Sequence, residues 1–288
     1  MDNQGVIFLN AGTKMLPRLL VSINSLRKHS TSDISILSIE GDGHDHCQKL
    51  CEYFDIKLVT IPKTIANRKY YWFEKARLHL YTPFNTSIFL DSDTVVLRNF
   101  DDLFDEVKKN DFIACQFSHW TSSGRTISKR LKQWSDTHPI LVENTINANI
   151  PSVNMGVYGF QKNAELMKHW FDITITHPSA NLPEESTCHF LLTQYKSKTV
   201  SHKYNCSCKH DDPKAKGVRI VHFHGRKHCR IDKPLKFKYN SDIWLKEWIE
   251  IYEKNICNIQ SWYGHMGDRY INTFMKRHYN QKLIESLA

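Results

Sequence analysis

The chain has 288 residues, of which 41% are hydrophobic and 24% charged, proportions typical of a globular protein with a buried core. Its formal net charge of +9 indicates an anionic partner such as a nucleotide diphosphate. Because the basic residues are scattered and form no localised run, the sequence argues against a nucleic-acid-binding arm, and we expect no nucleic-acid partner.

The N-terminus carries no recognisable secretory signal, since residues 1–5 lead directly into an apolar segment of only about five residues. No stretch approaches the ~20 consecutive apolar residues that span a bilayer. The eight cysteines are irregularly spaced in a chain long enough to fold without disulfides. We therefore expect reduced thiols and a cytoplasmic protein, and the sequence is compatible with a homodimer.

Strand-like and helix-like segments alternate along the first third of the chain. Short apolar runs predict strands, and apolar residues at helical spacing predict helices between them. This alternation predicts an α/β fold with a mostly parallel sheet and helices on both faces. The predicted strands are 5–9, 34–39, 57–61, 87–90 and 95–97, and the predicted helices are 16–26 and 70–81.

The second half of the chain continues the alternation less regularly. The region 118–150 gives no interpretable pattern, although its Trp120, Trp134 and His138 are of the kinds that stack on sugar rings or fill a core. We expect one domain over residues 1–256 and a helical tail over 257–288 that packs back on it. The predicted strands are 112–117, 153–160 and 219–223, and the predicted helices are 164–171, 186–195 and 244–252.

The first chemical signal is the motif Asp91-Ser92-Asp93, directly after the apolar strand 87–90. Alternate residues of an extended chain point to the same side, so both carboxylates can reach one object. In open α/β sheets, ligands bind outside the carboxyl ends of the strands, and Mg²⁺ or Mn²⁺ prefers carboxylate oxygens there. The alternative is a strand-ending turn with solvated acids, and spacing alone leaves both interpretations open.

The second signal is an apolar strand that ends in His222 and runs into a loop with His224 and Gly225. Imidazole can complete a metal shell, and glycine lets the backbone approach a phosphate closely. A structural zinc site is the rival interpretation, although the spacing does not match the usual zinc knuckles. Its candidate ligands are Cys206, Cys208, His210, His222, His224, His228 and Cys229.

These residues occur in an order that resembles family 8 glycosyltransferases of the glycogenin and galactinol-synthase type. Lys75 precedes Asp91 by sixteen residues, as a lysine does in that family. The run from Val153 to Val157, Val-Asn-Met-Gly-Val, is similar to the family's Asn-Ser-Gly-Val strand. Glu184-Glu185 stands where the family has Asp-Gln, and the run from His222 to Gly225 matches His-Phe-x-Gly. The resemblance covers about residues 5 to 235.

The resemblance implies a GT-A fold that uses a UDP-sugar with Mn²⁺ or Mg²⁺. The implied acceptor is a saccharide, a protein or a polyol. Three groups of residues are implied. The metal ligands are Asp91, Asp93 and His222; the nucleotide-sugar contacts are Asn10, Ala11, Gly12, Lys75, Ser92, Gly225, Lys227 and His228; and Asn154, Glu184 and Glu185 are the catalytic residues facing the sugar and the acceptor.

The chain also departs from the family pattern. The glutamate pair reaches one methylene further than Asp-Gln, and Lys227 stands one position early with His228 in the expected lysine place. The resemblance implies retention of anomeric configuration, while inversion with Glu185 as general base stays open. Two other classes remain: a non-catalytic or zinc-containing nucleic-acid-binding protein, and a nucleotidyltransferase.

Overall fold

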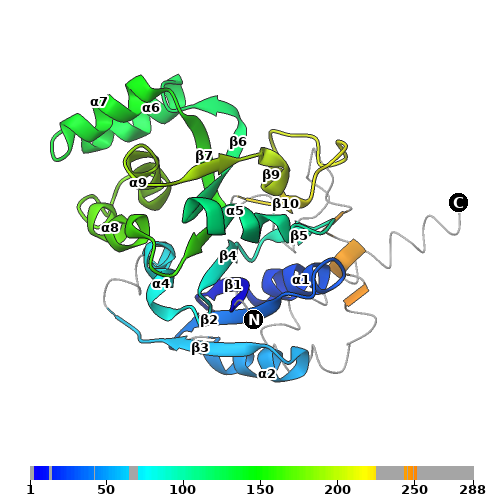
Figure 1. The fold of residues 1–288 in the computed structure, drawn as a ribbon. Helices are drawn as coiled ribbons and strands as arrows, with labels where there is room; N and C mark the ends of the chain where they lie inside the picture. Colours follow the sequence, from blue (N-terminus) through cyan, green and yellow to red (C-terminus); the bar gives the residue numbers. More distant parts are fainter. Residues whose placement is uncertain are drawn as a thin grey trace, which may run out of the picture.

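The computed structural model describes residues 3–12, 15–41, 43–64, 71–224, 243–244, 246–248 and 250–251. Its centre is a seven-stranded sheet with the strand order β3-β2-β1-β4-β7-β6-β8 (Figure 1). Six of these strands run parallel to one another, and β7 runs antiparallel to both of its neighbours, β4 and β6. The expected mixed, mostly parallel sheet is therefore confirmed. The strands are β1 (Gln4–Asn10), β2 (Asp33–Ile39), β3 (Lys57–Ile61), β4 (Thr86–Leu90), β6 (Phe112–Thr121), β7 (Pro151–Gln161) and β8 (Lys198–Val200).

A second, three-stranded sheet lies beyond the end of β4. It joins β5 (Thr94–Val96), β10 (Ile220–His222) and β9 (Cys206–Ser207), with β10 in the middle. The antiparallel pairing of β10 with β5 places His222 opposite Thr94. This pairing brings a late segment of the chain beside the Asp91-Ser92-Asp93 motif.

Helices cover both faces of the large sheet, because its strands are apolar on both sides. Along β1, Val6 and Phe8 belong to one hydrophobic core, and Ile7 and Leu9 belong to the other. The first core is shared with α1 (Leu16–Arg27), α2 (His44–Phe54) and α5 (Asp102–Asn110). The second is shared with η2 (Tyr71–Arg77), α4 (Leu78–Tyr81), α8 (Glu165–Thr174) and α9 (Pro183–Leu192).

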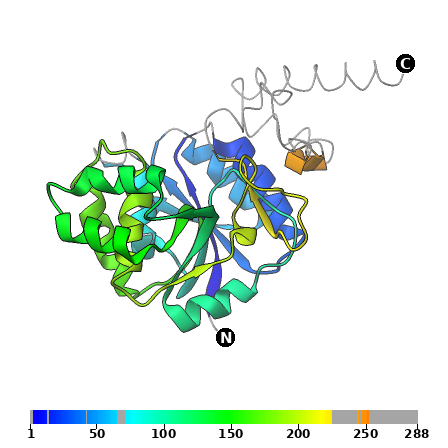
Figure 2. The same cartoon turned by 90° about the horizontal axis from the view of Figure 1, so that it is seen from above.

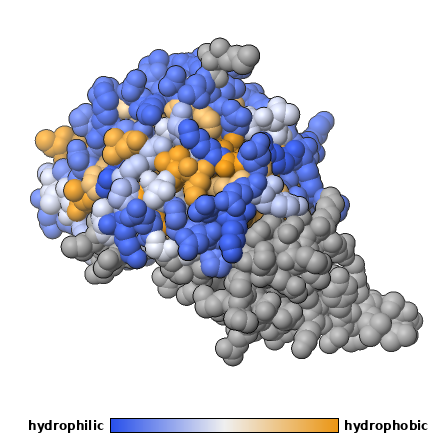
Figure 3. All heavy atoms as spheres, turned by 90° about the horizontal axis from the view of Figure 1, so that it is seen from below, coloured by the Kyte–Doolittle hydropathy of each residue, from blue (hydrophilic) through white to orange (hydrophobic). Residues whose placement is uncertain are grey.

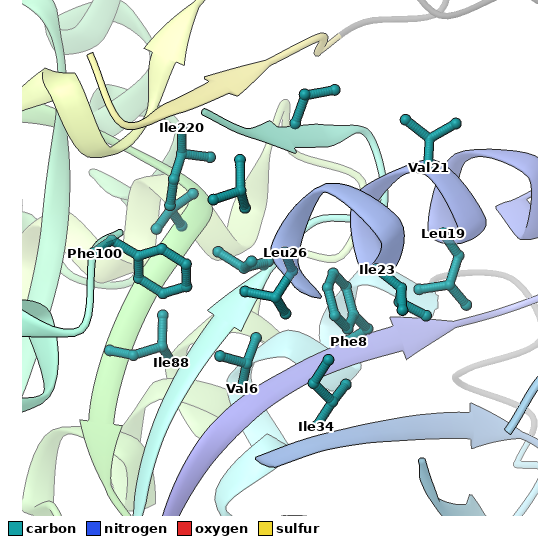
Figure 4. Packing of buried hydrophobic residues seen from close by; sticks show 14 of the residues in the cluster. Val6, Phe8, Leu19, Val21, Ile23, Leu26, Ile34, Ile88, Phe100 and Ile220 are labelled. Carbon is teal, nitrogen blue, oxygen red and sulfur yellow. The ribbon is translucent and has the colours of Figure 1, made fainter. Parts of the chain in front are cut away.

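The packing of α1 on the sheet illustrates the first core. Figure 4 shows Ile23 and Leu26 of this helix lying over Val6 and Phe8 of β1. All four side chains are fully buried. At about 1.5–3 kcal/mol for each buried side chain of this size, such contacts are the main source of stability for the fold.

Three further helices occupy the region 118–150, which shows no interpretable sequence pattern. They are α6 (Arg125–Leu131), the 3₁₀ helix η3 (Lys132–Trp134) and α7 (Pro139–Ala148). Ile127, Leu131, Trp134 and Val142 form a third core with Phe190 of α9. These helices gather with α8 and α9 at one end of the molecule, opposite β9 and β10 (Figure 1 and Figure 2). Trp134 is therefore a core residue.

Two helix predictions need correction. A single helix over 70–81 is wrong, because the backbone leaves helical geometry at Arg77 and divides the segment into η2 and α4. The carbonyl of Lys75 is taken by the Tyr158 hydroxyl at 2.7 Å, so tertiary contacts favour the tighter turns of η2. The helix predicted over 186–195 begins earlier, at Pro183, which suits a first helical turn. Glu184 and Glu185 therefore stand in the first turn of α9.

The described residues between 243 and 251 are helical, as predicted. Trp248 and Ile251 are fully buried, and Glu247 accepts hydrogen bonds from Asn24 of α1 and from Lys28, the residue that follows this helix. The predicted tail over 257–288 lies outside the described residues. Among the helices that are described, none has the length and apolar character needed to cross a membrane. The face shown in Figure 3 is mostly hydrophilic around a smaller hydrophobic area.

Candidate active site

The Asp91-Ser92-Asp93 motif forms a tight turn between β4 and β5. The amide and the hydroxyl of Thr94 both donate to the carbonyl of Asp91, at 3.1 and 2.8 Å. The amide of Asp91 donates to the carbonyl of Gly156 on β7 at 2.7 Å. The hydroxyl groups of Thr94 and Ser22 lie 2.8 Å apart, which ties the turn to α1. The turn is thus held from three sides, and the two carboxylates have a defined position.

Asp91, Asp93 and His222 converge at this turn, as the sequence predicted. One potential ligand atom from each lies within 4.8 Å of the others. The Nε2 atom of His222 is 3.1 Å from Oδ1 of Asp93 and 3.6 Å from Oδ2 of Asp91. Two carboxylates and one imidazole form a donor set that fits a divalent cation such as Mn²⁺ or Mg²⁺. Among the described residues, no other group of His, Cys, Asp and Glu converges in this way.

Gly156 makes room for the imidazole of His222. A Cβ atom at this position would collide with Cε1 and Nδ1 of the His222 ring. The amide of Gly156 donates to Oδ1 of Asn154 at 3.0 Å. The small residue in the Val153–Val157 run is therefore a steric requirement for the position of the His222 ring.

Basic groups balance the two acids of the motif. Lys75 on η2 lies 2.7 Å from Oδ1 and 2.8 Å from Oδ2 of Asp91. Burial lowers the pKa of Lys75, but the charges of Asp91, Glu184 and Asp93, with the hydrogen bond to Asp91, together outweigh it and raise the pKa above its ordinary value. Burial raises the pKa of Asp93, but the charge and hydrogen bond of His222, with Arg18 and Lys75, bring it down to about 2. Asp93 is therefore ionised throughout the neutral range.

The two glutamates of α9 lie in different environments, although both are buried. Glu185 is held at both oxygens: Arg130 donates to Oε1 at 2.5 Å, and Asn154 donates to Oε2 at 2.9 Å. Among the residues that the structure describes, Oε2 of Glu184 is buried and has no hydrogen-bond partner. Burial raises the pKa of Glu184 to about 7, against the opposing charge of Lys75, and the charges of Glu185 and Asp91 add to the rise. Glu185 is therefore held in place at both oxygens, whereas Glu184 titrates near neutrality.

Asn154 joins these elements into one network. Its amide nitrogen donates to Glu185, and its Oδ1 accepts from Gly156 and, at 3.1 Å, from Nδ2 of Asn205. Asn205 also donates to the Asn154 carbonyl at 2.9 Å. The side chain of Asn154 is therefore held by Glu185 at its nitrogen and by Gly156 and Asn205 at its oxygen.

The loop predicted to meet the nucleotide follows β1. Because β1 and β4 are parallel neighbours, Asn10 and Asp91 stand at the same edge of the sheet. Asn10 is fully buried: its Nδ2 donates to Ser38 at 3.3 Å, and its Oδ1 has no hydrogen-bond partner among the described residues. Gly12 has a φ of 105°, a conformation that glycine adopts without strain. Ala11 and Gly12 are half-buried, and Ser92 is buried within its turn.

Three predicted residues, Gly225, Lys227 and His228, lie outside the described residues, as does Cys229 of the zinc interpretation. Cys206 and Cys208 are buried, and burial raises the pKa of each thiol to about 12. Within the described part of the chain, these cysteines and the nearby histidines do not form a zinc site.

Two residues near the acids were not predicted. Arg18 on α1 places its Nη1 3.9 Å from Oδ2 of Asp93. Burial raises the pKa of Tyr71, with Lys75 opposing the rise and the charges of Asp91 and Asp93 adding to it, which places the Tyr71 phenol close to the site. Each lies on a helix without a local motif, so only the packing of α1 and η2 against the Asp91-Ser92-Asp93 turn reveals them.

No protein-family model and no curated protein sequence matches the chain. Solved structures match its fold. The galactosyltransferase LgtC, in complex with donor and acceptor sugar analogues, aligns with a TM-score of 0.58 and 13% identity over 87% of this chain and 96% of its own. GlyE of Streptococcus pneumoniae TIGR4 aligns with a TM-score of 0.57 and 14% identity over 88% of this chain. The bifunctional glycosyltransferase WbbM aligns with a TM-score of 0.58 and 13% identity over 89% of this chain.

The alignment covers 64% of GlyE and 52% of WbbM, so this chain spans about half to two thirds of those proteins. At such low identity the likeness shows the fold. The chain has the GT-A-type α/β fold of these glycosyltransferases, as expected, with an acid-and-histidine site at the carboxyl end of a central strand.

Proposed function

We propose that the chain is a metal-dependent glycosyltransferase that moves a hexose from a UDP-sugar to a saccharide, protein or polyol acceptor. The observation that carries the proposal is the convergence of Asp91, Asp93 and His222 at the end of β4 within a GT-A-type fold. The fold shared with three glycosyltransferases supports it, and so does the ordered family 8 resemblance. We propose Mn²⁺ as the cation, with Mg²⁺ as the alternative.

The chemistry fits the site. Breaking the anomeric bond leaves negative charge on the UDP diphosphate, and a bound divalent cation supplies a Lewis acid that stabilises this charge. Asp91 and Asp93 would hold the cation through carboxylate oxygens, and His222 through Nε2. Lys75 adds a positive charge at the same place and would contact the nucleotide-sugar, because its ammonium already pairs with Asp91.

The nucleotide end of the site begins at the loop after β1. The unpaired Oδ1 of Asn10 is a buried acceptor, and a buried acceptor without a partner is costly unless a ligand supplies the donor. We assign Asn10, Ala11, Gly12 and Ser92 to the nucleotide-sugar on this basis. From the resemblance alone we assign Gly225, Lys227 and His228 to the diphosphate.

At the sugar end we assign Asn154, Glu184 and Glu185. Arg130 and Asn154 occupy both carboxylate oxygens of Glu185, so Glu185 is a poor general base, which favours retention over inversion. Glu184, with its pKa of about 7 and an unpaired oxygen, is the member of the pair that we place against the donor sugar. The hydrogen bond between Asn154 and Glu185 would keep these two side chains in fixed positions beside the sugar.

We also propose a cytoplasmic setting. The six cysteines in the described part of the chain are buried and form no disulfide with one another. Such thiols are compatible with a reducing compartment.

A donor screen tests the proposal. The purified chain is incubated with Mn²⁺ and a panel of UDP-sugars and other nucleotide-sugars, and released UDP or other nucleotide is measured with and without EDTA. We expect cation-dependent UDP release from at least one UDP-sugar, at the slow rate of hydrolysis when no acceptor is present. If no nucleotide-sugar is turned over and no nucleotide with Mn²⁺ shifts the melting temperature, the proposal is wrong.

A further inference from the structure

A row of aromatic and imidazole rings leads from the metal-binding triad to the surface. The ring of His224 lies 5.2 Å from that of His222, and the ring of His210 stacks on His224 at 6.0 Å. Trp120 follows, 5.1 Å from His210. Burial falls along the row: His222 is 3% exposed, His224 is half-buried, and Trp120 is 37% exposed. The outer end is therefore open to solvent, directly beside the inner site.

The buried ring of Phe117 packs against three of these rings. Its ring meets those of Trp120, His210 and His224 edge-on at 5.3, 5.4 and 5.4 Å. Phe117 is buried, whereas Trp120 and His210 are exposed. Edge-to-face contacts of this kind fix ring orientation and add stability beyond area burial. Trp120 and His210 therefore form a supported surface, and we call these two residues the aromatic platform.

The backbone that carries Trp120 is irregular. Between the pairs Gln116–Val153 and Thr121–Pro151, β6 has four residues (117–120) where β7 has one (152), and the register shifts there. Ser118 within this bulge has a φ of 53°, which is uncommon for a residue other than glycine. Bulges re-aim side chains and are frequent next to active sites, where backbone strain is tolerated for function. The bulge turns Trp120 out of the sheet toward His210.

A purely structural role explains the platform poorly. A packing residue gains most when it is fully buried, yet the two outer rings remain exposed. A metal site is also a poor explanation. The histidine stacked on His210 is His224, and its Nε2 atom already forms a hydrogen bond with the Ser207 hydroxyl at 2.6 Å. Within the described part of the chain, the platform joins no group of potential metal ligands.

We propose that the aromatic platform is the acceptor subsite and that it binds a saccharide ring. This inference rests on the proposed function and narrows its acceptor to one class. A pyranose has a flat face of C–H groups rimmed by hydroxyls, which suits stacking on an exposed indole, and the imidazole of His210 can hydrogen-bond the rim. A peptide or an open-chain polyol lacks a rigid ring of this shape. The row of rings places the saccharide next to the site of donor cleavage.

The test separates donor cleavage from transfer. The wild type is compared with Trp120→Ala, with Trp120→Phe and with the control Tyr53→Ala. Tyr53 lies on α2 and serves as the control because it is also an exposed aromatic residue, at 47%. One assay follows UDP release from the UDP-sugar chosen in the donor screen without acceptor. The other follows glycosyl transfer to maltose, lactose and cellobiose, with glycerol and a serine-rich peptide as acceptors of the other two classes. Melting temperatures verify folding.

We expect saturable transfer to at least one disaccharide. Trp120→Ala should raise the acceptor KM about tenfold, while Trp120→Phe, which keeps a ring, should recover most of this loss. Tyr53→Ala should match wild type in both assays. If wild type cleaves the donor but only glycerol or the peptide accepts sugar, or if a folded Trp120→Ala keeps the wild-type acceptor KM, the inference is overturned while the proposed function stands. A wild type that turns over no nucleotide-sugar, and whose melting temperature no nucleotide with Mn²⁺ shifts, overturns both.

Discussion

Arg130 on α6 donates a 2.5 Å hydrogen bond to Oε1 of Glu185 on α9, and both side chains are buried. Asn154 occupies the second oxygen of the same carboxylate. Within the described part of the chain, one oxygen of the neighbouring Glu184 has no hydrogen-bond partner, and the pKa of Glu184 is raised to about 7, chiefly by burial. The two adjacent glutamates therefore differ in their hydrogen bonding, because Arg130 and Asn154 both bind Glu185.

Glu184 should make the protein less stable as the pH rises. Its pKa in the folded state, about 7, lies above the ordinary 4.5, so the folded state binds more protons between these values and stability falls across that window. By pH 8, the raised pKa of Glu184 lowers the free energy of unfolding by about 3 kcal/mol, and below pH 4 it has no effect. Glu184→Gln should remove this pH-dependent loss of stability. Urea unfolding of both proteins at several pH values, in metal-free buffer, measures the difference.

The matched control is Glu165→Gln on the neighbouring helix α8. Glu165 is exposed, and the hydrogen bond from Lys168 lowers its pKa. Its contribution to the free energy of unfolding therefore changes only at pH values below the ordinary pKa of glutamate. The difference between wild type and Glu165→Gln should be flat above pH 5. A flat difference curve for Glu184→Gln as well would show that Glu184 titrates normally.

Removing Arg130 should destabilise the fold strongly. Arg130→Met leaves the carboxylate of Glu185 buried without its cation, and breaking a buried pair in this way costs about 3–5 kcal/mol. The double variant Arg130→Met, Glu185→Gln has no buried charge to leave unpaired, so it should recover most of the loss. Chemical denaturation of the single and double variants checks this. Equal stability of the two would contradict a buried ion pair.

Gly156→Ala should impair metal binding. The added methyl group collides with the His222 ring and must displace it from Asp91 and Asp93. We expect the affinity for Mn²⁺ to fall about tenfold or more, as for the loss of an orienting contact in a metal site. Titration of Mn²⁺ followed by electron paramagnetic resonance measures this affinity.

Gly159→Ala is the control for this experiment. Gly159 lies on the same strand, but its added methyl group would meet Val107 and Ile88 in the core instead of His222. It should lower stability by about 1–3 kcal/mol through overpacking and leave the affinity for Mn²⁺ unchanged. Equal effects of the two substitutions on metal affinity would refute a specific role for Gly156.

Asp91→Asn and Asp93→Asn should each abolish cation-dependent cleavage of the UDP-sugar. An amide keeps the shape of the side chain but loses the charge that a hard cation requires. Both variants should remain folded, and Mn²⁺ should no longer raise their melting temperature as it raises that of the wild type. Cation-dependent turnover at the wild-type rate in either variant would exclude that residue as a ligand.

Much of the fold could be predicted because its signals are local. The continuous apolar runs of β1, β2 and β4 mark strands buried on both faces, and the apolar spacing of α1 marks the face that packs on them. The helices α6 and α7 escaped prediction because their apolar residues do not follow helical spacing clearly: α6 has only Ile127 and Leu131, and Ile140 of α7 is exposed. The buried ones meet a core completed by Phe190, from another part of the chain. The segment 71–81 was misjudged because Tyr158 and Asp91 act on its backbone and on Lys75 from a distance.

For the site, the sequence alone determined which side chains could hold a cation: Asp91 and Asp93 by their place after a buried strand, and His222 by its place in an ordered motif. The tertiary structure decided how they meet, since the pairing of β10 with β5 and the absence of a side chain at Gly156 bring the imidazole to the acids. It also decided the difference between Glu184 and Glu185. Charge state depends on burial and on partners distant in sequence, and neither can be read from two identical residues standing side by side.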